Sequence, residues 1–116
     1  MTRRQRHRAE RGIGEGELGS VYLLHFEPPY KHAGRYIGWT QKSVQERWVE
    51  HVSGKGSPLV RAAVEAGCAV VIARVWEAVD RHFERDLKDQ KNSTRLDPIT
   101  QGELTLADAW AMHHAD

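Results

Sequence analysis

Five polar side chains in this sequence are spaced so that they could share one site. Tyr22 and Tyr36 lie in two successive β-type segments. Arg47 and His51 are four residues apart, so on a helix they project from one face. Glu84 lies in a later helical segment. A carboxylate can bind a divalent cation, a guanidinium can hold a phosphate, and a phenol or imidazole can transfer protons, so the set matches the needs of phosphodiester cleavage.

Each of these residues also has a purely structural interpretation. A tyrosine in a strand is usually half-buried, with its hydroxyl at the rim of the core. Arginine and histidine on a helix are usually solvated. Glu84 and Lys88 have the spacing of an ordinary helical ion pair. Taken singly, the structural interpretation is the more common one, and only the combination of the five favours a site.

Other kinds of site find little support. The sequence has no phosphate-binding P-loop and no nucleophile elbow, and the glycines at 12, 14 and 16 follow no strand. The single cysteine, Cys68, excludes an internal disulfide and a multi-cysteine zinc site. Because it enters an apolar strand, a packed thiol is favoured over a nucleophile. For His113-His114, an interaction with the helix end is favoured over metal binding.

The elements that must position these residues follow from the apolar pattern. Strands are predicted at 21–26 and 35–40, paired as an antiparallel hairpin whose wide loop begins at Glu27-Pro28-Pro29. Ser43 caps a helix with Val44, Trp48 and Val52 as its buried stripe. Further elements are predicted as a helix capped by Ser57 and ending near 66, a strand at 68–76, a helix capped by Asp80 and ended by 92–94, and a short helix capped by Thr105.

This order, β-β-α-α-β-α-α, predicts an α+β fold. A small three-stranded sheet with helices on its faces would bury Trp48, Ile72, Phe83 and Leu87 together. At 116 residues the chain suits one domain. We divide it into a basic flexible arm at 1–17, a folded domain at 18–98, and a C-terminal loop and short helix at 99–116.

The net charge of +1 conceals an uneven distribution. The arm contains five arginines, Arg3, Arg4, Arg6, Arg8 and Arg11, and a solubilising tail and a phosphate-binding arm are equally good interpretations of it. No apolar stretch is long enough to cross a bilayer, and no signal peptide is apparent. With a single cysteine, a cytoplasmic protein is the simplest expectation, with no membrane partner.

The motifs resemble those of the GIY-YIG nuclease superfamily. Gly19-Ser20-Val21-Tyr22 and Tyr36-Ile37-Gly38, followed by Arg47, His51 and Glu84, are similar to the family's motifs, over about residues 18–98. The resemblance implies a small three-stranded antiparallel sheet flanked by helices, in agreement with the order above. Ser20 stands where the family's first motif has glycine, which is a departure at the start of the first strand.

The resemblance also implies roles for individual residues. The phenols of Tyr22 and Tyr36 would line the cleavage site, Arg47 would stabilise the charge developing on the phosphate, and His51 would lie in the site. Glu84 would be the carboxylate that binds the metal, Mg²⁺ (or Mn²⁺). The missing side chain of Gly38 would let helix and phosphate approach, and Asn92 would support the site.

The sequence therefore predicts a Mg²⁺-dependent DNA endonuclease in which either Tyr22 or His51 helps water attack phosphorus. The expected DNA contacts are Arg3, Arg4, Arg6, Arg8, Lys31, Lys42 and Lys55. The loop containing Lys31 is as readily a plain surface loop. The alternative is a catalytically inactive module that binds DNA or protein. A homodimer or a partner chain could dock on the C-terminal helix through Trp110 and Met112, although packing of that helix on its own core is favoured.

Overall fold

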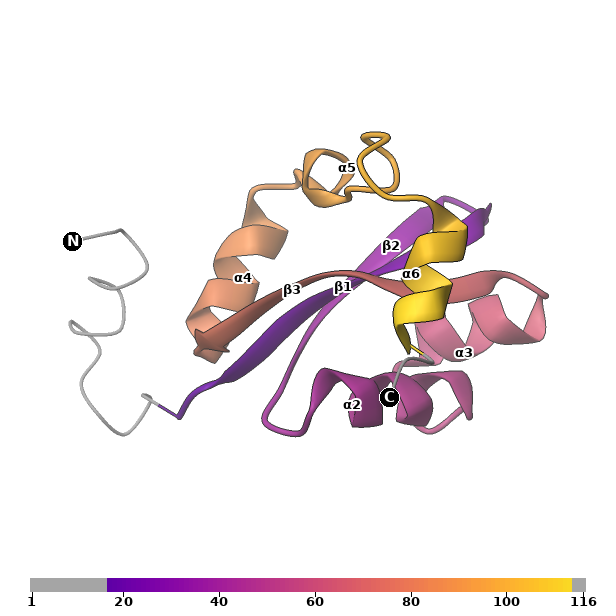
Figure 1. Cartoon of the computed structure of the whole chain (residues 1–116). Coiled ribbons are helices and arrows are strands. Elements are labelled where there is room, and N and C mark those ends of the chain that lie inside the picture. Colours follow the sequence, from indigo (N-terminus) through magenta and orange to yellow (C-terminus); the bar gives the residue numbers. More distant parts are fainter. Residues whose placement is uncertain (1–16, 114–116) are drawn as a thin grey trace.

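The computed structural model describes residues 17–113 of the chain. One antiparallel sheet has the strand order β2-β1-β3, with β1 at Gly19–Tyr30, β2 at Ala33–Thr40 and β3 at Ala69–Val79. Helices α2 (Val44–Val52) and α3 (Pro58–Glu65) lie between β2 and β3 in the sequence, and α4 (Arg81–Asp89), α5 (Ser93–Leu96) and α6 (Leu106–His113) follow β3. The predicted α+β class and antiparallel sheet are confirmed, and the single turn α5 is an addition to the predicted order (Figure 1).

The sheet separates two cores. Alternate residues of the central strand β1 face opposite sides, so Tyr22 and Leu24 belong to one core and Leu23 to the other. Helices α2 and α3 cover the first core and α4 covers the second, on the two sides of the sheet in Figure 1. The prediction of one shared core is wrong. Trp48 and Ile72 belong to the first core, whereas Phe83 and Leu87 belong to the second.

The hairpin between β1 and β2 is tighter than predicted. Strand β1 continues past two prolines to Tyr30, which pairs with Ala33 across a turn at Lys31 and His32. Proline has no N–H for a ladder, but the register shifts between His25 and Tyr30, so the prolines lie where β1 and β2 make no regular pairs. The predicted wide loop is therefore wrong.

The predicted helix caps are confirmed. The side chains of Ser43, Ser57 and Asp80 accept backbone N–H bonds at the starts of α2, α3 and α4. Thr105 accepts the N–H of Asp108 at the start of α6. Helix α4 ends earlier than predicted, at Asp89, and the chain then turns into α5. These caps fix where α2 and α4 begin, and so which of their side chains reach the sheet.

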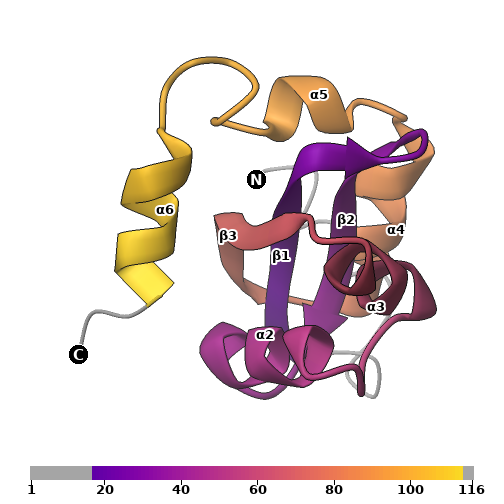
Figure 2. The ribbon, with the colours of Figure 1, turned by 90° about the vertical axis from the view of Figure 1, so that its right-hand side faces the viewer.

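Helix α6 packs beside the free edge of β3 (Figure 2). His113 is buried, and its Nε2 accepts the N–H of Ile72 at 2.6 Å. Trp110 meets Trp48 edge-on, with ring centroids 6.0 Å apart, and stays half exposed. The helix thus packs on the protein's own core, and Met112 lies exposed at 64%.

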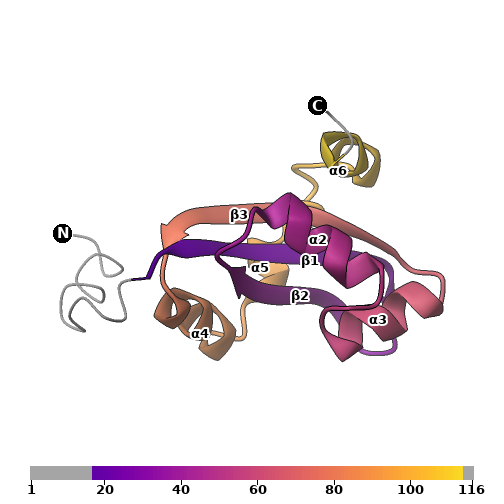
Figure 3. The same cartoon turned by 90° about the horizontal axis from the view of Figure 1, so that it is seen from below.

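Helix α4 lies on the opposite side of the molecule, near β2 (Figure 3). It covers the face of the sheet opposite to the face that α2 and α3 cover. Within residues 17–113, no helix is both long and apolar enough to cross a membrane.

Candidate functional site

A buried phenol–imidazole pair lies at the centre of the site. Tyr22 of β1 and His51 in the last turn of α2 are 1% and 0% exposed. Their Oη and Nε2 atoms are 2.8 Å apart. Tyr36 of β2 lies beside them, with its ring centroid 5.3 Å from that of His51 and 6.3 Å from that of Tyr22. Three of the five predicted residues therefore form one ring cluster between β1, β2 and α2.

Gly38 makes room for this cluster. It pairs with Tyr22 across the β1–β2 ladder, and a Cβ at this position would lie 2.3 Å from the Tyr22 Oη. It would also lie 2.9 Å from a ring carbon of Tyr36. Any side chain here would displace both phenols. The group lying over Gly38 is thus the Tyr22 phenol.

The backbone fixes the tautomer of His51. The N–H of Ser57 donates to its Nδ1 at 3.1 Å, so Nδ1 carries no proton. Burial, with the charge of Arg47 adding to it, lowers the pKa of His51 to about 4, and the ring is neutral at pH 7. Its one proton is therefore on Nε2, which donates to the Tyr22 Oη. Gly56 permits the arrangement, because a Cβ there would lie 2.2 Å from Nδ1.

Arg47 links this pair to the surface. Its guanidinium bonds to the Tyr22 side chain and, at 2.8 Å, to Glu50 Oε1, while its side chain remains 30% exposed. Glu50 also pairs with Lys42. Lys42, and then Arg47, lower the pKa of Glu50 to about 2. The sequence interpretation missed Glu50, although its spacing of three residues from Arg47 was a usable signal.

The Tyr22 hydroxyl has two donors and is still a phenol at neutral pH. Burial raises the pKa of Tyr22 to about 12, and the nearby Tyr36 and Glu84 add to this effect. The hydrogen bond from Arg47 acts in the opposite direction. Since Arg47 and His51 both donate to its oxygen, any negative charge on that oxygen would be stabilised where it forms.

Glu84 approaches from the other face of the sheet. It lies on α4, where its carboxylate pairs with Lys88 at 3.3 Å, and its side chain is 22% exposed. The Lys88 Nζ lies 5.7 Å from the ring centroid of Tyr36. The charge of Glu84 is felt at Tyr22. Helix α4 thus brings the predicted carboxylate to the edge of the sheet where the ring cluster lies.

The donors near Glu84 suit a hard divalent cation. Residues 17–113 contain no group of three or more His, Cys, Asp or Glu side chains placed to hold a metal ion. Mg²⁺ commonly binds through one or two carboxylates and completes its shell with water and phosphate oxygens. The partly exposed carboxylate of Glu84 fits that arrangement, with Lys88 as the cation it would exchange for the metal.

The remaining residues predicted from the sequence are Asn92, expected to support the site, and the expected DNA contacts. Asn92 begins α5 and lines a hollow of about 260 Å³ with Tyr36 and Lys88. Lys31 is in the β1–β2 turn, beside the ring of Tyr30, and Lys55 is exposed between α2 and α3. Lys42 forms an ion pair with Glu50. The predicted arm with Arg3, Arg4, Arg6 and Arg8 lies outside the described residues.

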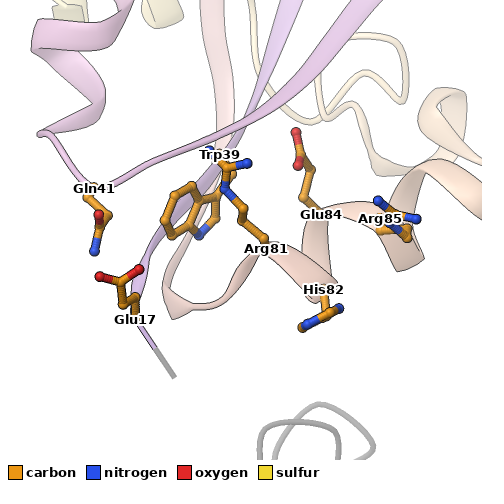
Figure 4. A pocket seen from close by; sticks show the side chains of 7 residues that line it. All are labelled: Glu17, Trp39, Gln41, Arg81, His82, Glu84 and Arg85. Atoms are coloured by element: carbon orange, nitrogen blue, oxygen red, sulfur yellow. The ribbon is translucent and has the colours of Figure 1, made fainter. Parts of the chain in front are cut away.

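A second hollow, of about 410 Å³, opens beside Glu84 (Figure 4). Trp39, Gln41, Arg81 and Arg85 line it together with Glu84. The sequence interpretation assigned no role to these four neighbours of Glu84.

No family model matches the chain, and searches of curated proteins and of solved structures give no match.

Proposed function

We propose that this protein is a cytoplasmic Mg²⁺-dependent endonuclease of the GIY-YIG type that hydrolyses phosphodiester bonds in DNA. The observation that carries the proposal is the junction of Tyr22, Arg47 and His51, with Tyr36 and Glu84 at its exposed side. It supplies a fixed cation, a carboxylate and a phenol under two donors at one edge of the sheet. The motif resemblance supports the same assignment.

In this proposal Arg47 holds the phosphate. Its partly exposed guanidinium can donate hydrogen bonds to phosphate oxygens, and it keeps its charge at any working pH. Glu84 would hold Mg²⁺, which when bound polarises the phosphate and stabilises the leaving oxygen. The half-buried phenol of Tyr36, beside the Tyr22 ring, orients the attacking water.

Of the two candidate general bases, the geometry favours Tyr22. His51 has no free acceptor nitrogen, because Nδ1 accepts from Ser57 and Nε2 carries the proton. Tyr22 acts as its phenolate, which forms when the phenol loses its own proton to solvent and which the donors His51 and Arg47 stabilise. This phenolate takes the proton of the attacking water and becomes the phenol again. His51 is then a positioning residue that acts through Tyr22.

One observation favours the second candidate, an inactive DNA-binding or protein-binding module. Both chemical groups already have partners within the chain, since Arg47 pairs with Glu50 and Glu84 pairs with Lys88. A domain kept for binding alone could use them as surface ion pairs. In that case replacing Glu84 would leave DNA binding intact and there would be no cleavage to lose.

Nicking of supercoiled plasmid in Mg²⁺ tests the proposal. We expect the wild type to nick, and Glu84→Gln and Arg47→Ala to lose about 10²–10³-fold of the rate, the usual cost of removing one electrostatic stabiliser. The controls are Glu65→Gln and Arg61→Ala, which break an exposed ion pair on α3 with the four-residue spacing of Glu84 and Lys88 and should nick like wild type. A wild type that binds plasmid and never cuts it, with any divalent ion, would favour the inactive module.

A further inference from the structure

The hollow beside Glu84 has the chemistry of a nucleotide-binding site. Its volume of about 410 Å³ falls within the range of about 300–1,000 Å³ typical of ligand pockets. Aromatic, guanidinium and amide groups line it, contributed by Trp39, Arg81, Arg85 and Gln41. The indole can stack on a base, the guanidiniums can bind a phosphate, and the amide can form hydrogen bonds to the edge of a base.

The Trp39 ring and the Arg81 guanidinium form a cation–π pair that lines the hollow. The indole Nε1 of Trp39 donates to the carbonyl of Val79 at 3.0 Å, which fixes the orientation of the ring. The guanidinium carbon of Arg81 lies 4.8 Å from the centroid of that ring. Because Arg81 is exposed, the pair presents a flat cationic surface to solvent. Bases of single-stranded nucleic acids stack on surfaces of this kind.

The two arginines of the hollow can bind an anionic ligand. Arg81 and Arg85 are four residues apart on α4 and exposed, and neither forms an ion pair with a carboxylate of residues 17–113. By contrast, Arg35, Arg47 and Arg61 each pair with an acid. A phosphate at Arg81 and Arg85 would therefore compete with no acidic partner within the described residues.

The acidic groups set the direction of the ligand. Figure 4 shows Glu17 beside Gln41 on one side of the Trp39–Arg81 pair, with Arg85 on the other side. A phosphate is repelled from the side of Glu17 and attracted to Arg81 and Arg85, whose two charges outnumber the nearby carboxylate of Glu84. Glu84 lines the same hollow, so a nucleotide bound there would lie directly beside the carboxylate proposed to bind metal.

We infer that this hollow binds one unpaired nucleotide of a DNA strand, next to the phosphodiester that the site would cleave. Its phosphate lies on Arg81 and Arg85, and its base stacks on the Trp39–Arg81 pair. A paired base is already stacked within the duplex and cannot enter. The inference rests on the proposed function for the position of the scissile bond, and it adds a substrate class, namely DNA with an unpaired nucleotide at the cleavage point.

Binding measured without cleavage tests the hollow. The anisotropy of a short fluorescein-labelled DNA strand, and of its duplex, is followed with the full chain in EDTA over a series of salt concentrations. For Arg81→Ala/Arg85→Ala we expect at least tenfold weaker binding of the single strand. The salt dependence should become shallower by about 0.7, because the two arginines hold one phosphate, and duplex binding should change less.

Matched variants separate the hollow from general charge and folding effects. Arg61→Ala removes an exposed arginine elsewhere and should change binding less than twofold. Arg85→Ala alone replaces an exposed residue and should give an intermediate loss of single-strand binding. It serves as the test if the double variant folds poorly. Equal binding of the single strand by Arg85→Ala and Arg61→Ala would overturn the inference. Competition by a deoxynucleoside monophosphate as strong as that by the strand would also overturn it, because the site would then not recognise a strand.

The two proposals fail in distinguishable ways. If the chain never nicks DNA but the arginine variants lose binding of the single strand, nucleotide binding in the hollow is supported and the nuclease activity is refuted. If the chain nicks plasmid and the arginine variants bind the single strand like wild type, the nuclease activity is supported and nucleotide binding in the hollow is refuted.

Discussion

Two buried histidines of this protein have opposite surroundings. His25 of β1 faces carboxylates at both ring nitrogens, with Nδ1 2.6 Å from Asp97 and Nε2 2.8 Å from Glu27. His51 of α2 faces a backbone donor at Nδ1 and a phenol at Nε2. The His25 ring therefore bonds to an acid at each nitrogen, whereas the His51 cluster directs its donors at one oxygen.

The clusters also differ in how completely they are closed. Asp97 is 0% exposed and accepts from Ile99 N–H, the Thr100 hydroxyl and His25. Around Tyr22, by contrast, Arg47 and Glu84 keep 30% and 22% of their side chains exposed. A closed network ties the segment after α5 to the sheet. An open one leaves charged groups for a ligand, and this difference separates a structural polar cluster from a candidate site.

Asp97→Ala is expected to have the largest effect on stability. Removing this buried carboxylate leaves the Nδ1 of His25 and the guanidinium of Arg35 without their acidic partner, which typically costs about 3–5 kcal/mol. Urea unfolding followed by tryptophan fluorescence measures this loss. Nicking per folded molecule should remain close to that of wild type.

Glu27→Ala is the matched control within the same cluster. Its carboxylate also bonds to His25, but the side chain is 52% exposed, so its loss should cost no more than about 1 kcal/mol. Equal destabilisation by the two variants would show that the His25 cluster is not closed around Asp97.

Gly38→Ala should damage the open cluster. The new Cβ would lie 2.3 Å from the Tyr22 Oη, so we expect a stability loss of about 1–3 kcal/mol and at least about a tenfold loss of nicking. Gly34→Ala, on the same strand, meets only a proline carbon at 4.0 Å and should be neutral in both assays. A normal nicking rate in Gly38→Ala would contradict the placement of the phenol.

The His51 environment predicts a pH dependence of smaller size. The folded pKa of about 4 lies below the ordinary 6.5, so the unfolded chain binds more protons between these values. Stability should fall as the pH drops through this window, by up to about 1.4 kcal/mol per pH unit. Because glutamine does not titrate, His51→Gln should flatten this part of the curve. Unfolding at a series of pH values measures it, and parallel curves would refute the buried neutral imidazole.

Much of the fold could be predicted from the sequence because its signals are local. Caps such as Ser43 and Asp80 act on N–H groups two or three residues away, and they fall where predicted. The antiparallel hairpin was predicted, but the extension of β1 to a tight turn was not, because two prolines are compatible with a strand only where the ladder is interrupted. The assignment of Phe83 to a second core depends on which side of the sheet α4 packs, and that is a tertiary property.

The candidate site, like the fold, could be predicted from the sequence only in part. The spacing of Arg47 and His51 predicted a shared helix face, and the two reach the same phenol. The tautomer of His51 depends on the N–H of Ser57, beyond the end of the helix, which no side-chain pattern records. The hollow at Trp39 and Arg81 joins a strand end to the start of a helix far along the chain, and neither residue carried a signal alone.

The central claim, that the open cluster cleaves phosphodiesters, is tested most directly by the Mg²⁺-dependent nicking rate of wild type against Glu84→Gln. Unfolding curves for the two proteins should match, since the replaced carboxylate lies in a partly exposed pair. The account predicts nicking that stops in EDTA and falls by about 10²–10³-fold in the variant. Equal rates for the two proteins, or a folded wild type that cuts with no divalent ion, would contradict it.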